Sequence, residues 1–290
     1  MDLPSLETFL AVAELGSFSA AGQKLYLTQP AVSKRIANLE SQLNASLFDR
    51  IGREVTLTEA GHLLMGKAQQ LLNDMRELQS SVSQLSETGV RSLSLASSHH
   101  IGLHYLGPLL RQFSQDNPLA KLDLRFMESE QAISSLLNRD IELVLTTIPS
   151  PLPKDLVAQT FWKDELIFVA AHDDPLAQKK RIRLNELTYS NAILPEPGTT
   201  TYQIIEQTFN RHHIPLKRVI HVNYLETIHA LVSNGLGWSL LPKKMIAAEL
   251  QQLDVDGVEL SRNLGLIEHK QRTLSNGARA FKEVLAENGL

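Results

Sequence analysis

Apolar residues recur at helical spacing three times within the first 45 residues. The first pattern stops at Gly16, a residue that commonly ends a helix, and a second short helix is expected after Ser17 or Ser19. The third begins at Thr28 and places apolar positions 32, 36, 39 and 43 on one face. Residues 47–50 and 55–57 then predict two short strands around a tight turn. Three helices followed by a small β-hairpin indicate a compact domain with a wing.

A long helix is predicted from residue 59, with Thr58 as its N-cap. Its apolar residues alternate at steps of four and three, which is the heptad pattern of a two-helix seam. The seam consists of Leu64, Ala68, Leu71, Met75, Leu78, Val82 and Leu85. Such a helix either pairs with a second copy of the chain or packs on its own domain. Because the stripe is narrow and polar residues flank it, the sequence favours a homodimer.

Beyond residue 90 the pattern changes to alternating strands and helices. Strands are expected at 92–97, 122–128, 141–149, 165–171, 191–194, 218–223 and 264–270, with another after Gly235. Helices are expected over 101–115, 131–139, 200–213, 225–234 and 276–289. This alternation predicts an α/β domain with room for two lobes.

Composition narrows the class of protein. The chain has 290 residues, 43% of them hydrophobic, a net charge of −4 and no cysteine. Disulfides and thiolate zinc sites are therefore excluded, and any binding of nucleic acid must come from a local patch. The first 23 residues carry acids where a signal peptide carries basic residues, and no run reaches the roughly 18 apolar residues of a membrane helix. We therefore expect a cytoplasmic protein without a membrane partner.

The start of the third helix, LTQPAVSKRI at 27–36, is suited to DNA. Thr28 is expected to cap the helix with its side chain, and Pro30 fits the first turn, where its missing N–H costs nothing. Free N–H groups at this end can hold a phosphate, while Gln29, Ser33 and Lys34 can reach base edges in a major groove. Arg35 is expected to face the DNA backbone. An ordinary solvated surface helix is the alternative.

The segment from Phe9 to residue 64 resembles the N-terminal domain of LysR-type transcriptional regulators. The matching residues include Gly16-Ser17-Phe18, Ala20-Ala21, the run 28–33, Leu39-Glu40, Leu47-Phe48, Arg50 and the run 57–61. The resemblance implies that Gln29, Pro30, Ser33 and Lys34 approach bases, and that Thr28, Arg35 and Arg53 approach phosphates or the minor groove. It also implies an operator in double-stranded DNA with dyad symmetry, and a homodimer or homotetramer. One departure is that residues 1–88 hold seven Lys or Arg against ten Asp or Glu.

The same resemblance covers the whole chain and implies a multi-domain architecture. A winged helix-turn-helix domain over 1–58 is followed by a linker and dimerisation helix with a hinge over 59–89. An effector-binding domain over 90–290 then contains two Rossmann-like subdomains, as in periplasmic binding proteins. Their expected limits are 90–161 with 267–290 for the first lobe, and 162–266 for the second.

Polar residues follow several predicted strands, where ligands of α/β sheets gather. The candidates for effector binding are Ser97, Ser98, His99, His100, Thr146, Thr147, Thr199, Thr200, Thr201 and Asn223. Hydroxyl groups and free helix N–H groups suit an oxyanion, so we expect a small anionic metabolite. Alternatively, Ser98 and Thr199 or Thr200 act only as N-caps.

Other chemistry finds little support. His100 and His104 lie one helical turn apart, but neither a cysteine nor a nearby acid completes a metal site, so neither a metal nor another cofactor is expected. The chain has no phosphate-binding glycine loop, GxSxG or HExxH motif, which argues against an enzyme. Two alternatives to a ligand-responsive regulator stay open: a small-molecule-binding protein whose winged domain contacts proteins, and a repressor that needs no effector.

Overall fold

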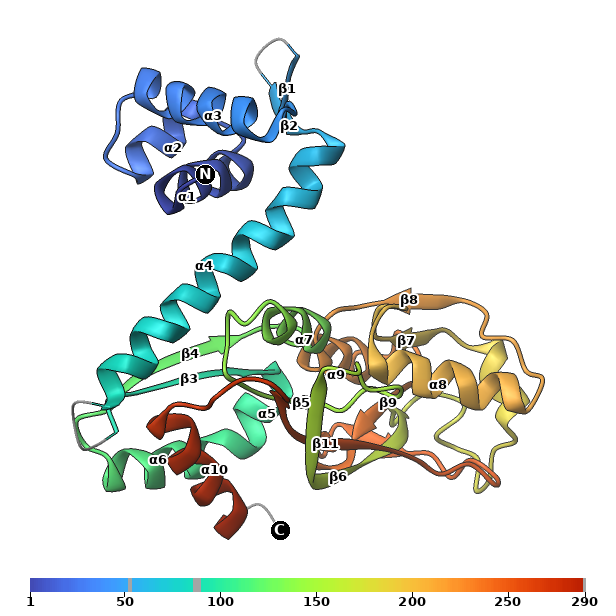
Figure 1. Cartoon of the computed structure of the whole chain (residues 1–290). Helices are drawn as coiled ribbons and strands as arrows, with labels where there is room; N and C mark the ends of the chain where they lie inside the picture. Colours follow the sequence, from blue (N-terminus) through green and yellow to red (C-terminus); the bar gives the residue numbers. More distant parts are fainter. Residues whose placement is uncertain (52–53, 86–89, 289–290) are drawn as a thin grey trace. The chain divides into compact units, whose positions relative to one another are not determined.

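The computed structural model of the chain describes residues 1–51, 54–85 and 90–288 (Figure 1). The chain divides into two compact units near residue 88. The first is helical with a β-hairpin, and the second is a mixed α/β domain. The predicted fold class is therefore confirmed. None of the helices described is both long enough and apolar enough to cross a membrane.

Three short helices form the N-terminal unit around one hydrophobic core: α1 Leu3–Leu15, α2 Phe18–Lys24 and α3 Gln29–Leu43. The Asp2 carboxylate caps α1 by accepting from the Ser5 N–H at 2.8 Å, and Gly16 ends it in a left-handed conformation with φ 58°. Ser17 then caps α2. The predicted helix limits at Gly16 and Ser17 are confirmed.

The turn between α2 and α3 is tight at Gly22. A Cβ atom built there would lie 2.8 Å from the Leu27 carbonyl oxygen. The Leu27 N–H donates to the Gly22 carbonyl oxygen, also at 2.8 Å. Only glycine leaves room for this approach. The same turn holds Tyr26 with a positive φ of 56°. Gly22 thus fixes how closely α3 follows α2.

The wing is the antiparallel pair β1 Phe48–Ile51 and β2 Glu54–Leu57, in which Phe48 pairs with Leu57. Phe48 anchors it, because its ring lies 5.3 Å from the Phe9 ring and 5.7 Å from the Phe18 ring. The predicted strands are confirmed. Arg53, predicted for the wing tip, lies outside the described residues.

The long helix α4 covers Glu59–Leu85, and the Thr58 hydroxyl caps it by accepting from the Gly61 N–H at 3.0 Å. Its predicted seam has two parts. Leu64 and Ala68 pack into the core of the N-terminal unit, so this part of the helix packs on its own domain. Leu71 and Leu78 are 45% and 64% exposed, and Met75 is half-buried. The side chains of Val82 and Leu85 are not among those described.

The first lobe of the C-terminal unit is a sheet with one hydrophobic core on each side. Strands β3 Ser92–Ser97, β4 Lys121–Phe126 and β5 Leu143–Thr147 are parallel, with β3 in the middle. Helices α6 Gly107–Asp116 and α10 Asn276–Asn288 cover one face, and α7 Ser129–Leu137 covers the other (Figure 1). Leu95 and Ala96 point to opposite faces, as strand geometry requires.

The second lobe is built the same way. Its strands are β7 Ala192–Leu194, β8 Val219–His221, β9 Ser239–Pro242 and β10 Leu250–Gln252. Helix α8 Thr200–Arg211 packs with Trp238 on one face, and α9 Leu225–Ser233 packs with Leu241 on the other. At Gly237 two backbone segments approach closely: an added Cβ would meet the Asn191 carbonyl oxygen at 2.1 Å.

Two long antiparallel strands, β6 Leu156–Ala171 and β11 Leu260–His269, cross from one lobe to the other. Trp162 and Leu264 belong to the first-lobe core, whereas Leu166 and Leu260 belong to the second. The boundary between the lobes therefore falls between Trp162 and Leu166 on β6 and between Leu260 and Leu264 on β11. Leu264 and Leu266, which were expected in the second lobe, pack in the first.

Several elements differ from their predicted forms. Strand β6 has 16 residues, whereas only 165–171 were expected, and β10 was not predicted. The helix predicted over 101–115 begins as α5 His99–Ile101, widens into a π-helical turn over Gly102–Leu106 and continues as α6. Sequence periodicity does not distinguish a π turn from an α turn over five residues.

Candidate functional site: a helix N-terminus and an interlobe cleft

The first candidate site is the exposed N-terminal end of α3. Thr28 is its N-cap, but its side chain makes no capping hydrogen bond, so the predicted side-chain cap is wrong. Pro30 occupies the first turn as predicted, and Thr28, Gln29, Pro30 and Lys34 are all exposed. The first turn of this helix thus presents free polar groups to the surroundings.

Hydrogen bonds hold two groups of side chains near the N-terminal end of α3 in place. Gln29 Nε2 donates to Ser33 Oγ at 2.9 Å, which holds both donors on one side of the helix. Arg35 is half-buried, and its Nη1 lies 3.4 Å from Thr8 Oγ1 of α1. Arg35 is therefore directed toward α1, whereas Gln29, Ser33 and Lys34 lie on the accessible part of the turn.

The cationic character of this surface is modest. Lys24 Nζ pairs with Glu14 at 2.6 Å, which leaves one less free cation near α3. Tyr26, in the turn before α3, is 97% exposed and offers a hydroxyl beside the helix end. Its position directly before the helix was the only signal in the sequence that could have marked it.

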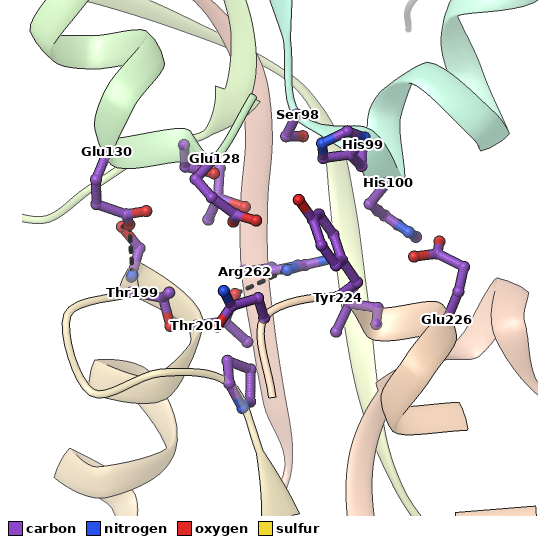
Figure 2. Close-up of a pocket in the computed structure, with 16 residues that line it drawn as sticks. Ser98, His99, His100, Glu128, Glu130, Thr199, Thr201, Tyr224, Glu226 and Arg262 are labelled. Atoms are coloured by element: carbon purple, nitrogen blue, oxygen red, sulfur yellow. Dashed lines mark hydrogen bonds between the residues drawn. The ribbon is translucent and has the colours of Figure 1, made fainter. Parts of the chain in front are cut away.

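The second candidate site is a cleft between the two lobes of the C-terminal unit (Figure 2). It lies where β3, β4 and β5 end and where α7, α8 and α9 begin, an arrangement typical of ligand sites in α/β domains. Its lining residues are Ser98, His99, His100, Glu128, Ser129, Glu130, Thr147, Pro195, Thr199, Thr200, Thr201, Asn223, Tyr224, Leu225, Glu226 and Arg262. The cavity measures about 60 Å³. A few water molecules fit it, so a larger ligand requires the lobes to separate.

Eight of the ten residues predicted for effector binding line this cleft. Ser97 and Thr146 do not: both are buried, and the Ser97 hydroxyl donates to the Ser98 carbonyl oxygen at 3.1 Å. Each precedes a lining residue in or directly after a strand, where successive side chains point to opposite faces. The Ser97 and Thr146 side chains therefore point away from the cleft, contrary to the prediction.

The upper wall of the cleft in Figure 2 carries Ser98 and the two adjacent histidines. Ser98 makes no capping hydrogen bond, so the alternative of a simple N-cap does not hold for its side chain. The His99 ring meets the Tyr224 ring edge to face at 5.0 Å, and these residues come from opposite lobes. This aromatic contact spans the cleft.

A buried polar network joins the lobes at the crossing strands. Arg262 Nε donates to Asp164 Oδ2 at 2.8 Å, and Arg262 Nη1 donates to Thr201 Oγ1 at 2.7 Å. His100 Nε2 lies 3.4 Å from the same Asp164 oxygen. Arg262 and Asp164 are 6% and 3% exposed. Arg262 Nη2 is buried and has no hydrogen-bond partner among the residues described.

The network also sets the charge states of its members. Burial lowers the pKa of His100 below its ordinary value, although the contact with Asp164 acts in the opposite direction. Burial acts to raise the pKa of Asp164, but His100 and the Arg262 charge outweigh it and lower that pKa. At neutral pH His100 is therefore uncharged, while Asp164 and Arg262 form an ion pair.

Helix α8 begins at the cleft, and two of its threonines already have local roles. Thr199 Oγ1 accepts from the Tyr202 N–H at 3.2 Å, so Thr199 is an N-cap, as the alternative interpretation held. The Thr200 N–H and hydroxyl donate to Glu130 Oε1 of the first lobe at 2.9 and 3.2 Å. A carboxylate from within the chain thus occupies the anion position at the start of α8.

Arg262, Glu128, Glu130 and Glu226 were not predicted for the cleft. Glu128 is the second residue after β4, as Ser98 is the first after β3, so the end of that strand was a usable signal. Glu226 lies in the first turn of α9. Arg262 lies inside β11 between the polar residues Ser261 and Asn263, so the local sequence gave no signal that it is buried. Burial raises the pKa of Glu128 above its ordinary value.

The described part of the chain also has a larger, open groove of about 860 Å³ along β6 and residues 252–261. None of the described residues that line this groove begins a helix, in contrast to the cleft between the lobes. His100 and His104 rings lie 4.8 Å apart, but no group of three or more histidine or acidic residues within the described ranges is arranged for a metal. The cleft is therefore the stronger candidate for a ligand.

Two family models match the sequence. The bacterial regulatory helix-turn-helix protein, lysR family, matches residues 3–62, and the LysR substrate binding domain matches residues 86–289. A probable RuBisCO transcriptional regulator from Trichormus variabilis is 31% identical over 97% of this chain and 86% of its own length. The RuBisCO operon transcriptional regulator of Allochromatium vinosum is 30% identical over 99% and 96%.

Solved structures share the fold. CbnR, a LysR family transcriptional regulator, aligns with a TM-score of 0.72 at 21% identity over all of both chains. The effector binding domain of QuiR in complex with shikimate aligns with a TM-score of 0.63 at 21% identity, over 69% of this chain and 98% of that one. The chain therefore belongs to the LysR family of transcriptional regulators, with an N-terminal helix-turn-helix DNA-binding domain and a C-terminal effector-binding domain.

Proposed function

We propose that this regulator responds to a small molecule carrying a carboxylate or another oxyanion, bound in the cleft between the two lobes. The observation that carries the proposal is Arg262 Nη2, a buried guanidinium nitrogen on the cleft wall without a partner among the described residues. A buried donor of this kind is costly unless an acceptor satisfies it. The half-buried Ser98 hydroxyl and the N-terminus of α9 add further donors.

The QuiR effector domain holds shikimate, an organic anion, which is consistent with this ligand class. We further propose that effector binding changes how the two lobes are arranged and, through the packing of dimers into a tetramer, the bend of the bound DNA. This mode of action rests on the family resemblance.

The test of the effector proposal is thermal unfolding of the full-length protein with carboxylates, sulfate and neutral metabolites. We expect the melting temperature to rise with carboxylates. Stabilisation by neutral ligands alone would contradict the proposal.

For DNA, we propose that Gln29, Pro30, Ser33 and Lys34 approach bases of an operator with dyad symmetry. We propose that Thr28, Arg35 and Arg53 contact phosphates or the minor groove. The accessible side of the first turn of α3 supports the first set, and the contact of Arg35 with Thr8 directs Arg35 away from the bases. We also propose a homodimer through Leu71, Met75, Leu78, Val82 and Leu85, a homotetramer, and a cytoplasmic location.

The DNA proposal predicts that Lys34→Ala weakens operator binding and that Arg53→Ala lowers the slope of affinity against salt by about one. Lys67→Ala, an exposed cation on α4, is the matched control. If Lys34→Ala and Arg53→Ala both bind the operator like the parent protein, the N-terminal unit serves another partner, such as a protein.

A further inference from the structure

The cleft contains more acidic side chains than an anion alone would favour. Glu128, Glu130 and Glu226 line it together with Arg262. Glu130 is satisfied by Thr200. By contrast, Glu128 Oε1 and Glu226 Oε1 are both buried, and within the described ranges neither has a hydrogen-bond partner. Two carboxylate oxygens in the cleft therefore lack a donor.

These two carboxylates come from opposite lobes. Glu128 follows β4 in the first lobe, and Glu226 belongs to α9 in the second. A negative charge near a helix N-terminus stabilises the helix, which explains an acid at position 226 in the first turn of α9. This interaction does not give the buried Glu226 Oε1 atom a hydrogen-bond donor. Each of the two carboxylates leaves a buried acceptor without a donor, and Glu130 places a further like charge near Glu128. A cationic donor between the lobes would remove this penalty.

Arg262 poses the opposite requirement. Its side chain is 5% exposed, its Nε and Nη1 are already engaged, and its Nη2 still needs an acceptor. A ligand that satisfies the cleft must thus supply an anionic acceptor to Arg262 and cationic donors to Glu128 and Glu226. A dicarboxylate would meet the two glutamates with like charge, and a diamine would leave Arg262 without an acceptor.

We propose that the effector is a zwitterion of the amino-acid class. Its carboxylate pairs with Arg262 Nη2 and the Ser98 hydroxyl, and its ammonium group, which has three donors, pairs with Glu128 and Glu226. This inference deepens the proposed oxyanion-sensing function and rests on it. The small cavity limits a ligand in the arrangement described to a compact polar head, so a side chain requires the lobes to open.

The experiment uses the full-length protein and the twenty standard L-amino acids, added one at a time in thermal unfolding. For each amino acid that raises the melting temperature, affinity is measured by titration calorimetry. The same measurement follows with the carboxylic acid that lacks its amino group and with the amine that lacks its carboxylate. We expect both truncated compounds to bind at least about tenfold more weakly, since each leaves a charged group of the cleft unpaired.

Variants assign the ammonium contact. Glu128→Gln and Glu226→Gln should each weaken amino-acid binding at least about tenfold while improving binding of the acid without the amino group, because a repulsive charge is removed. Glu283→Gln, on the exposed surface of α10, is the matched control and should change neither affinity. Far-UV circular dichroism and the melting temperature of each variant confirm that it is folded.

Three results would overturn the inference in distinguishable ways. If acids without an amino group bind as tightly as amino acids, the zwitterion is wrong and the oxyanion function stands. If the two glutamine variants bind amino acids like the parent, Glu128 and Glu226 do not hold the ammonium group. If none of the amino acids or carboxylic acids stabilises the protein, the proposed oxyanion function fails as well.

Discussion

The carboxylate of Glu130, in the first lobe, accepts hydrogen bonds from the N–H and the hydroxyl of Thr200, in the second lobe, at 2.9 and 3.2 Å. Because Thr200 is the first residue of α8, this contact satisfies part of a helix N-terminus across the cleft. The contact couples the arrangement of the lobes to a single acidic side chain.

Glu130→Ala should therefore lower the free energy of unfolding of the C-terminal unit by about 1–3 kcal/mol, the cost of leaving a buried donor unsatisfied. Glu130→Gln retains an acceptor oxygen and should lose less. Urea unfolding followed by tryptophan fluorescence measures this unit, because both tryptophans of the chain, Trp162 and Trp238, lie in it. Equal stability of Glu130→Ala and a control such as Glu283→Ala would contradict the role of the contact.

His100 should make the same unit sensitive to mild acid. Burial lowers its pKa in the folded protein below the value of 6.5, while Asp164, Arg262 and His104 modulate this shift. The unfolded chain thus binds this proton more readily than the folded one, and stability falls as the pH drops below about 6.5. His100→Gln should flatten the decline in the urea midpoint between pH 7 and pH 5.

The exposed His212 supplies the comparison, since His212→Gln removes a histidine without changing the buried network. An unchanged pH dependence in His100→Gln would show that other groups cause the decline.

Gly22 and Gly66 make a matched pair in the N-terminal unit. Gly22→Ala should destabilise it by about 1–3 kcal/mol, because the new Cβ meets the Leu27 carbonyl oxygen at 2.8 Å. Gly66→Ala, inside α4 with open space around its Cα, should stabilise it by up to about 1 kcal/mol. Thermal unfolding followed by far-UV circular dichroism measures both. Equal effects of the two substitutions would rule out a special role for the α2–α3 turn.

The exposed part of the α4 seam predicts a change in assembly. The double variant Leu71→Glu/Leu78→Glu should reduce the sedimentation coefficient toward that of a smaller species, since charges would replace apolar side chains that are 45% and 64% exposed in the single chain. Met65→Glu lies about 120° around the helix from Leu71 and should leave assembly intact. A parental sedimentation profile for the double variant would exclude the seam as a dimer contact.

The helical elements followed closely from the sequence because their ends carry local signals. Gly16, Ser17 and Thr58 act through their own backbone or side-chain geometry, which no distant contact overrides. The length of β6 did not follow, because residues 156–164 pair with β11, about a hundred residues away. A strand whose partner is remote has no local pattern that fixes its end.

The position of the cleft was predicted from the sequence, but its charged residues were not. Hydroxyl residues after strands were found because strand ends converge in every α/β sheet. Arg262 was missed since its role depends on Asp164 and Thr201, which pairing and folding bring to it. Ser97 and Thr146 were included in error because the facing of a strand's last residue depends on the pleat and not on the residue type.

The crossing strands have a consequence for how such a receptor can diversify. Each lobe keeps its own hydrophobic clusters, and of the residues that line the cleft in the described structure, only Leu225 packs against one of them. Substitutions at lining positions outside the Glu130–Thr200 contact, the Thr199 cap and the Arg262 network thus change what the cleft recognises while the hydrophobic cores stay intact. At those positions ligand preference and folding stability can vary almost independently, so a new effector can be acquired there through few mutations without first stabilising the scaffold.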